Sequence, residues 1–281
     1  MTMTKLSRLS TALPSGAEVW RLLPPLALGG EAQMALDREL LNQQVAHSGA
    51  PTLRFYTWVP LAISLGYHQR HWPPHWDSLQ WQGQSVALVR RPSGGRAVLH
   101  QGDLTYAIAL PLGRQRRQDS YRLLCDGLIA GWRTLGVRLD YGTAGRGYIH
   151  RPDCFGTATG ADLVTPEGYK LIGSAQLRRG HALLQHGSMR LWPDPDLTGQ
   201  VFGQGLPPWS APDWLQAAVA PEQRQAVLGQ IAATLSAAIA SALQVTFQPS
   251  PLTSREEKVL ARVGTLLQSC PSNPAMEFLD L

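Results

Sequence analysis

The stretch from residue 161 to residue 189 constrains the fold most, because it predicts strands that are joined by tight turns. The pair LV (163–164) is followed by PEG (166–168), where proline and glycine suit a type I turn with a positive φ at the glycine. Two apolar runs come next, YKLIGSAQL and HALLQHGSM, with an Arg-Arg-Gly turn between them. Such a pattern indicates antiparallel neighbours. The chain must therefore build a sheet that contains a β-meander.

Other segments add helices and strands on both sides of this meander. Apolar residues at helical spacing predict helices, and short β-branched or aromatic runs predict strands. The letters SREE (254–257) match a capping box that would open the last helix. Pro60 ends the strand LRFYTW, and we expect the next run, LAISLGY, to pair with that strand. The predicted helices cover 31–43, 119–136, 221–243 and 254–267, and the further strands cover 53–58, 61–67, 86–91 and 103–111. This combination predicts an α+β fold in which mixed and antiparallel sheets are flanked by helices.

Length and composition indicate how the chain is organised. The 281 residues suffice for one large domain or two small ones, and no linker is evident. We expect residues 1–17 to be a disordered N-terminus and residues 18–281 to form a single domain with C-terminal helices. The three cysteines form no CxxC pair, which favours a reducing compartment and a cytoplasmic location. From the sequence we expect no apolar run as long as a membrane span, and therefore no membrane association.

The charged residues bear on the kind of partner. Lysine and arginine number 25 against 20 acidic residues, and lysine occurs only at Lys5, Lys170 and Lys258. Arginine favours bidentate contact with carboxylates and phosphates, so the excess indicates an acidic partner. No basic tract carries interleaved aromatic residues, which argues against a nucleic-acid groove. The histidines at 68, 71 and 75 lack the cysteine or carboxylate companions of a zinc site, so we expect no metal.

A glycine turn directly after a predicted strand is the first candidate for ligand binding. Residues 90–100 (RRPSGGRAVLH) put Gly94 and Gly95 where backbone N–H groups can approach a ligand closely. Arg91 and Arg96 could neutralise a phosphate or a phosphopantetheine linker there. A plain tight turn with solvated arginines explains the same letters, since short glycine motifs also match by chance. Both interpretations stay open on this pattern alone.

Three single residues outside that turn also bear on chemistry. Lys170 stands alone in the middle of a chain that otherwise uses arginine, and lysine is the cation whose pKa moves readily. Cys154 lies in a predicted loop, where a nearby cation would favour its thiolate. His186 precedes a glycine at a strand end and could orient a substrate or relay a proton. Each also has a structural explanation: a surface lysine, a small core cysteine and a satisfied histidine. Cys125 falls inside a predicted helix and is assigned to the core.

Taken in order, three motifs resemble the lipoate/biotin protein ligase superfamily. Residues 90–100 are similar to its arginine–glycine turn, residues 170–178 (KLIGSAQLR) to its lysine stretch and residues 186–188 (HGS) to its histidine–glycine pair. Within the superfamily, GGRAVLH followed by LTY (104–106) looks like the LipM type of octanoyl-carrier-protein:protein octanoyltransferase. That type has a Cys-Phe pair ahead of the lysine stretch, and Cys154-Phe155 matches it.

The resemblance implies a lipoate/biotin ligase-like acyltransferase catalytic domain over residues 18–281. It makes Cys154 the nucleophile and Lys170 its catalytic neighbour, where the ammonium would lower the thiol pKa and help hold the acyl carbonyl. The substrate-binding residues that it implies are Arg91, Ser93, Gly94, Gly95, Arg96, His100, Gly173, Ser174, Ala175, His186 and Gly187.

The implied reaction belongs to lipoate biosynthesis and needs no cofactor. It transfers an octanoyl or lipoyl group from acyl carrier protein, through a thioester on Cys154, to a lysine of a lipoyl domain. That domain would belong to glycine cleavage H protein or to a 2-oxoacid dehydrogenase E2. A second hypothesis on the same fold is an ATP-dependent lipoate ligase, or a biotin ligase, which would require ATP and Mg. A third is a non-catalytic homologue that binds an acyl group or a carrier domain, because GTAT (156–159) replaces the family's usual Asp-Ala-Pro-Ser run.

Overall fold

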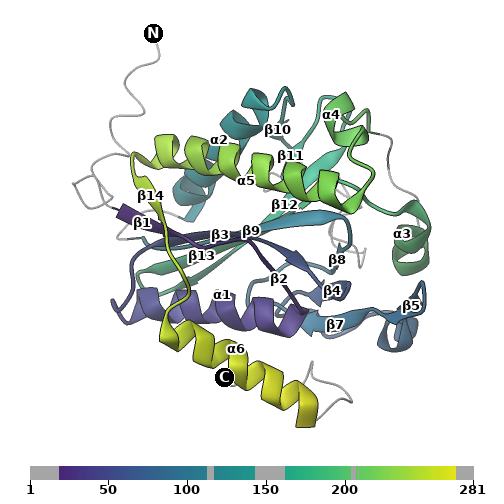
Figure 1. Cartoon of the computed structure of the whole chain (residues 1–281), viewed down its shortest axis with the longest axis horizontal. Helices are drawn as coiled ribbons and strands as arrows, with labels where there is room; N and C mark the ends of the chain where they lie inside the picture. The colour runs from purple at the N-terminus through teal and green to yellow at the C-terminus, as the bar shows by residue number, and fades with distance from the viewer. Residues whose placement is uncertain (1–18, 113–116, 143–161, 204–206, 208, 270–281) are drawn as a thin grey trace.

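The computed structural model describes residues 19–112, 117–142, 162–203, 207 and 209–269, and Figure 1 shows helices on both sides of a central sheet. The expected disorder of residues 1–17 concerns residues outside this described part. The helices are α1 (Gly30–Val45), α2 (Arg117–Thr134), α3 (Pro195–Phe202), α4 (Asp213–Gln216), α5 (Pro221–Leu243) and α6 (Ser254–Ser269), and a 3-10 helix covers Pro74–Ser78. The strands are β1 (Val19–Leu22), β2 (Leu26–Leu28), β3 (Thr52–Trp58), β4 (Ala62–Leu65), β5 (Gln80–Trp81), β6 (Gln84–Ser85), β7 (Ala87–Arg90), β8 (Val98–His100), β9 (Asp103–Pro111), β10 (Asp140–Tyr141), β11 (Asp162–Val164), β12 (Lys170–Arg179), β13 (Ala182–Arg190) and β14 (Thr246–Pro249).

Within the described residues, the main sheet has nine strands of mixed direction. Its order is β10-β11-β12-β13-β9-β3-β1-β14, and β2 also pairs with β3. The strands from β10 to β3 in this order are antiparallel to their neighbours, whereas β1 runs parallel to both β3 and β14. A second sheet has the order β7-β4-β8, and β5 and β6 form a small hairpin. The predicted α+β class with mixed and antiparallel sheets flanked by helices is confirmed.

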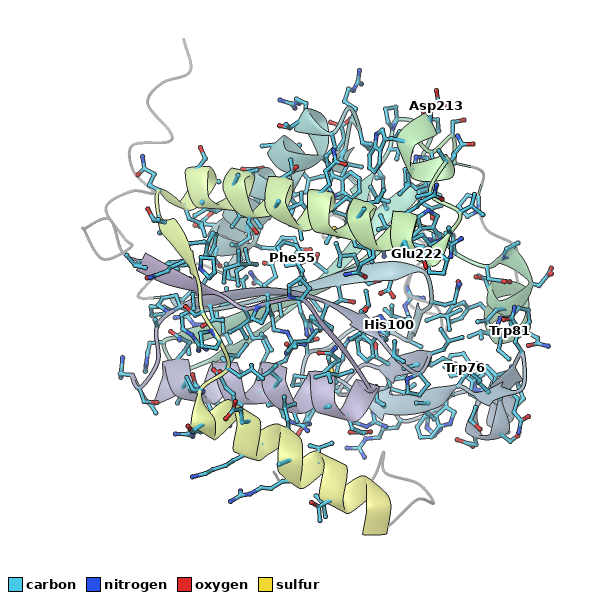
Figure 2. All side chains as sticks on the ribbon, in the orientation of Figure 1. Phe55, Trp76, Trp81, His100, Asp213 and Glu222 are labelled. Atoms are coloured by element: carbon cyan, nitrogen blue, oxygen red, sulfur yellow. The ribbon has the colours of Figure 1, made fainter. Side chains whose placement is uncertain are left out.

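Side chains of β9 alternate between the two faces of the sheet, which places a hydrophobic core on each side. Tyr106 and Ile108 belong to the core beneath α2 and α5, whereas Ala107 and Ala109 belong to the core against α1. Figure 2 shows the side chains that fill both layers, with Phe55 of β3 on the side of α5. On the other face α1 lies next to the sheet, and α6 is the outermost layer (Figure 1).

The predicted meander is confirmed, but one predicted strand pair is wrong. β11, β12 and β13 pair antiparallel in sequence order, and Gly168 in the first turn has a φ of +86°. The sequence predicts that residues 61–67 pair with the strand before Pro60. Instead, β4 pairs with β7 and β8 in the second sheet. The physical reason is that both edges of β3 are already occupied, by β9 on one side and by β1 and β2 on the other.

The start of α6 is fixed by a capping box one residue earlier than predicted. The Glu256 carboxylate accepts the Thr253 N–H at 2.7 Å, and the Thr253 hydroxyl accepts the Glu256 N–H at 3.3 Å. The same carboxylate is fully buried, forms an ion pair with Arg21 at 2.7 Å and accepts a hydrogen bond from Gln43 at 3.2 Å. These contacts hold the start of α6 against α1 and β1.

Helix α5 corrects one expectation from the sequence. By length and composition its 23 residues are apolar enough to cross a membrane, so the statement that no run approaches that length is wrong. Core helices of soluble proteins pass the same test. Here Ile231, Leu235 and Ile239 of α5 are buried in the core that α5 shares with α2 and the main sheet.

Candidate active site

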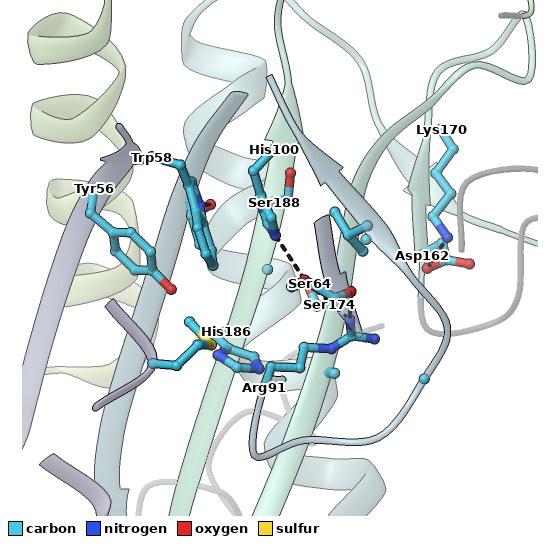
Figure 3. Close-up of a pocket in the computed structure, with 17 residues that line it drawn as sticks. Tyr56, Trp58, Ser64, Arg91, His100, Asp162, Lys170, Ser174, His186 and Ser188 are labelled. Carbon is cyan, nitrogen blue, oxygen red and sulfur yellow. Dashed lines mark hydrogen bonds and ion pairs between the residues drawn. The ribbon is translucent and has the colours of Figure 1, made fainter. Parts of the chain in front are cut away.

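A pocket with a cavity of about 80 Å³ lies between strands of the main sheet and strands of the second sheet. Met34 of α1, with Tyr56 and Trp58 of β3, supplies apolar wall, and Val98 of β8 adds to it. The close-up in Figure 3 shows the two aromatic rings on one side of the pocket and Lys170 with Asp162 on the other. The pocket therefore pairs an apolar wall with a charged one.

The arginine–glycine turn forms one edge of the pocket, and Arg91 ties that turn together. The buried Arg91 guanidinium donates to the Gly94 carbonyl at 3.0 Å, to the Arg96 carbonyl at 2.6 Å and to the Ser64 carbonyl at 2.8 Å. Gly95 has a φ of +97°, a conformation that favours glycine. Arg91 is thus committed to backbone carbonyls, which argues against its predicted use in neutralising a phosphate.

A first hydrogen-bonded relay runs along the pocket floor through His100. Its Nδ1 lies 2.8 Å from the Asp103 carboxylate and its Nε2 lies 2.9 Å from the Ser64 hydroxyl. A carboxylate only accepts, so Nδ1 carries the proton and Nε2 accepts from Ser64. Burial lowers the pKa of His100, which keeps the ring neutral. Trp58 stacks on the same ring at 3.7 Å between centroids, which fixes the ring plane.

The Asp103 carboxylate is shared by more than one donor. The Ser188 hydroxyl donates to it at 2.7 Å and the Thr105 hydroxyl at 3.1 Å. The Trp58 indole in turn donates to the Thr105 hydroxyl at 2.8 Å. The first relay therefore joins β3, β4, β8, β9 and β13 beneath the pocket.

A second relay of the same chemical order runs through His186. Its Nδ1 lies 2.8 Å from the Asp37 carboxylate of α1, and its Nε2 lies 2.5 Å from the Ser93 hydroxyl in the glycine turn. The Tyr56 hydroxyl also donates to Asp37, at 3.1 Å, and Arg54 lies 3.6 Å from its other oxygen. This relay connects the first helix, the glycine turn and β13.

The glycine after His186 is required by space. A methyl group on Gly187 would lie 2.7 Å from Cε1 of Tyr106 and 2.8 Å from the Gly173 carbonyl oxygen, and it would also collide with the Ser174 hydroxyl. Ser174 and Tyr106 share a hydrogen bond of 2.9 Å at this contact. Gly187 therefore allows β12 and β13 to bring the lysine stretch and the histidine–glycine pair together.

Lys170 sits at the start of β12 and is almost fully buried. Its ammonium forms an ion pair of 2.8 Å with Asp162 of β11, and both side chains are at most 5% exposed. A buried ion pair holds both partners in one geometry, because removing either one leaves an uncompensated charge. The pair presents a fixed positive group at the pocket wall (Figure 3).

The proposed nucleophile Cys154 lies outside the described residues, so its predicted meeting with Lys170 stays a prediction. Cys125 on α2 is fully buried, and burial raises the pKa of its thiol to about 12. At neutral pH this thiol is un-ionised and is no nucleophile. Its assignment to the core is confirmed.

The donor groups of the described residues do not gather into a metal site. No group of three or more His, Cys, Asp or Glu that could hold a metal ion occurs among them. Asp37 and Asp103 are each committed to a histidine, and Asp162 to Lys170. The arrangement suits an acyl group, with its chain against the apolar wall and its polar end towards the ammonium.

A comparison with protein families identifies the domain that holds this pocket. The model of the lipoyl protein ligase A/B catalytic domain matches residues 30–212, which include every pocket residue described above. The chain belongs to this family. The family assignment made from the three motifs is therefore confirmed.

Two relatives that match this chain carry the same name. "Octanoyltransferase LipM" of Carboxydothermus hydrogenoformans is 37% identical over 189 residues, which covers 66% of this chain and 70% of the relative. "Octanoyltransferase LipM" of Brevibacillus brevis is 30% identical over 261 residues, which covers 85% of this chain and 92% of the relative. The likeness thus extends well beyond the pocket.

Solved structures support the lipoyl protein ligase fold. A lipoate-protein ligase A bound with ATP matches with a TM-score of 0.66 at 21% identity, covering 88% of this chain and 94% of that chain. A bi-partite lipoate protein ligase from Thermoplasma acidophilum, reported together with its E2 lipoyl domain, matches with a TM-score of 0.63 at 18% identity, covering 87% and 91%. At these identities the likeness concerns the fold alone.

The lipoyl protein ligase fold brings most of the predicted residues to one place. The predicted residues that line the pocket are Arg91, Gly95, His100, Lys170, Gly173, Ser174, Ala175, His186 and Gly187. Ser93, Gly94 and Arg96 lie just behind the wall, where they bond to His186 or to Arg91.

Sequence reasoning missed the acidic partners of this site. Asp162 neutralises Lys170, while Asp37 and Asp103 orient the two histidines. A signal existed for Asp103, three residues after His100 at the start of a strand. The signal for Asp37 was weaker: an acidic residue in the middle of an apolar helix face. Ser64 gave none, because its strand was assigned to the wrong neighbour.

Proposed function

We propose that this chain is an octanoyltransferase of the lipoyl protein ligase A/B family, which moves an octanoyl group to a lysine of a lipoyl domain. The observation that carries the proposal is the buried Lys170–Asp162 pair facing an apolar pocket wall, in a chain whose relatives are named octanoyltransferases. An eight-carbon chain needs an apolar surface, and its thioester carbonyl needs a nearby positive group.

The reaction proceeds by two acyl exchanges. In the first, the Cys154 thiolate attacks the carbonyl carbon of an octanoyl thioester, the bond from that carbon to the carrier sulfur breaks, and the carrier leaves as a thiol after taking a proton. In the second, the amine of a lipoyl-domain lysine attacks the new thioester. An amide forms, the amine loses a proton and Cys154 is released. A thiolate suits both steps because it is a good nucleophile and a good leaving group.

Lys170 acts in both exchanges through its fixed charge. Oxygen becomes negative in each tetrahedral intermediate, and a pre-positioned ammonium stabilises that charge. Asp162 holds the ammonium in place at 2.8 Å. Because Asp162 balances the charge of the pair as a whole, Lys170 acts through the position of its ammonium next to the reacting oxygen.

The partners and conditions follow from this chemistry. The donor is octanoyl-acyl carrier protein, and the acceptor is the lipoyl domain of glycine cleavage H protein or of a 2-oxoacid dehydrogenase E2. The exchange consumes no nucleotide and needs no metal, since the thioester already carries the activation. We place the reaction in the cytoplasm, in keeping with a reactive thiol.

The test is the covalent intermediate. Purified protein is incubated with octanoyl-acyl carrier protein, and its intact mass is measured. We expect one octanoyl adduct that hydroxylamine removes, absent in Cys154→Ala and retained in Cys125→Ala. An unmodified wild-type protein, or an adduct that survives in Cys154→Ala, contradicts the proposal. Octanoylation only from free octanoate, with pyrophosphate release, would favour the ATP-dependent ligase.

A further inference from the structure

A second hollow lies on the far side of α1 from the pocket, between α1 and α6, with a cavity of about 370 Å³. We call it the α1–α6 groove. Its apolar floor includes Ala35, Val259 and Val263. Successive residues of α1 separate the two sites: Met34 lines the pocket and Ala35 lines the groove. Both sites are thus built in part on one helix, whose diameter is roughly 10 Å.

The rim of the α1–α6 groove is basic. Arg38 comes from α1, and Arg255, Lys258 and Arg262 come from α6. The three α6 residues are spaced by three and four positions, so they form one row along a single helix face. Glu39 is the groove's acidic residue and is committed to Arg255, with an ion pair of 2.5 Å.

Among the described residues, three of the four cations form no direct ion pair. Within the described part of the chain, no carboxylate lies within ion-pair distance of Arg38, Lys258 or Arg262. Arg38 is half-buried, and burial lowers its pKa although Glu31 and Asp37 act in the opposite direction. Lys258 and Arg262 are exposed like charges on one face of α6, so an external polyanion would stabilise this face.

The shape of the groove indicates what kind of polyanion fits. α1 and α6 are neighbouring helices whose surface ridges leave a groove that a third helix can occupy. The ion pair of Glu256 with Arg21 and its hydrogen bond from Gln43 fix the start of α6, so the groove exists before any partner binds. A row of exposed cations along one helix face matches the acidic face of a partner helix.

We propose that the α1–α6 groove receives an acidic helix of the acyl carrier protein that delivers the octanoyl group. The inference rests on the proposed function and adds the docking surface of the donor. The carrier would sit on one side of α1 and its flexible thioester arm would reach around the start of that helix into the pocket. The cations serve encounter and orientation, because such charges act mainly on association.

The experiment compares a protein-borne donor with a small one. In Lys258→Glu/Arg262→Glu, kcat/KM for octanoyl-acyl carrier protein is expected to fall about tenfold or more at low salt. The small donor octanoyl-pantetheine carries no acidic helix, so its kcat/KM should stay unchanged. The matched control Arg133→Glu/Arg138→Glu makes the same charge change on exposed residues at and just after the end of α2, and it should behave as wild type. The milder Lys258→Gln/Arg262→Gln should show an intermediate loss and a flatter salt dependence.

The outcomes separate the two proposals. If wild-type protein transfers an octanoyl group from neither donor, the proposed function fails, whatever the groove does. If wild-type protein uses octanoyl-acyl carrier protein but the charge reversal leaves those kinetics unchanged, the docking inference is overturned. It is also overturned if the reversal slows only transfer to the lipoyl domain, because the groove would then receive the acceptor. Equal losses with both donors would indicate damaged folding, and the glutamine variant then decides by its salt dependence.

Discussion

The pocket and the α1–α6 groove lie on opposite sides of one helix and treat charge in opposite ways. In the pocket, buried charges have partners: Lys170 has Asp162, and the two histidines have Asp103 and Asp37. At the rim of the groove, cations such as Lys258 are exposed to solvent and form no ion pair with a carboxylate among the described residues. A paired, buried charge holds the groups of a reaction in one geometry, whereas an unpaired surface charge remains able to attract another molecule.

The strongest way to break this comparison is to remove the charge of Lys170. Lys170→Met removes one member of a buried ion pair, so we expect a loss of about 3–5 kcal/mol in the free energy of unfolding. Octanoyl transfer should fall by about 100-fold or more, because the carbonyl loses its positive neighbour. Denaturant unfolding and the transfer rate check both. Lys258→Met on the groove should change stability by less than about 0.5 kcal/mol.

A double variant separates the two effects of that change. Lys170→Met/Asp162→Asn removes both charges and should recover part of the lost stability without recovering activity. Recovery of activity in the double variant would show that Lys170 has a structural role alone.

Asp103→Asn tests the first relay. His100, Ser188 and Thr105 all donate to one carboxylate oxygen, and a neutral amide oxygen in its place is a weaker acceptor, so we expect a loss of about 2–3 kcal/mol in the free energy of unfolding. The exposed Asp140→Asn is the control and should be neutral. Unfolding curves at pH 8 give the comparison. An Asp103→Asn protein as stable as wild type would mean that the relay adds nothing to the fold.

Space at the pocket is tested at Gly187. Gly187→Ala forces a methyl group against Tyr106 and the Gly173 carbonyl, with an expected cost of about 1–3 kcal/mol. A methyl group on Gly199 of α3 would meet no other atom within 4 Å, so Gly199→Ala should instead stabilise the fold by about 0.5–1 kcal/mol. Thermal unfolding of the two variants should therefore shift in opposite directions.

The smallest expected effect concerns Glu31, a buried acid at the start of α1 whose charge interacts with Arg38. Burial raises its pKa from 4.5 to about 7, so the folded state keeps a proton that the unfolded state has lost between those values. Its contribution to stability is therefore lost as pH rises through this window. Glu31→Gln should raise the unfolding free energy by about 1–2 kcal/mol at pH 8 and hardly at all at pH 4.5. An equal effect at both pH values would contradict this account.

Much of the site could be predicted from the sequence because its residues lie in three compact motifs. Lys170, His186 and the glycine turn can be recognised from the sequence motifs that contain them. The antiparallel pairing of β12 with β13 follows from the turn between them. The carboxylate Asp37 could not be predicted this way, because it reaches His186 only through the packing of α1 against β13. Asp103 and Asp162 lie closer in the chain to His100 and Lys170, and only the folded strands show that they contact them.

The fold shows the same limit at the second sheet. The turn before β4 predicts where β3 ends, but the neighbour of β4 depends on which edges of β3 are already taken. That competition involves β1, β2 and β9, far apart in the chain. Arg91 likewise carries the expected charge, and only the folded turn directs it to carbonyls instead of a ligand.

The central claim, acyl exchange without nucleotide at the Lys170 pocket, is tested most directly by one transfer reaction. Protein, octanoyl-acyl carrier protein and a lipoyl domain are mixed in buffer treated with apyrase, and the lipoyl domain is weighed by mass spectrometry. The account predicts one octanoyl group on a single lysine, formed at the same rate with and without added ATP and lost in Lys170→Met. An unmodified lipoyl domain, or modification that requires ATP, would contradict it.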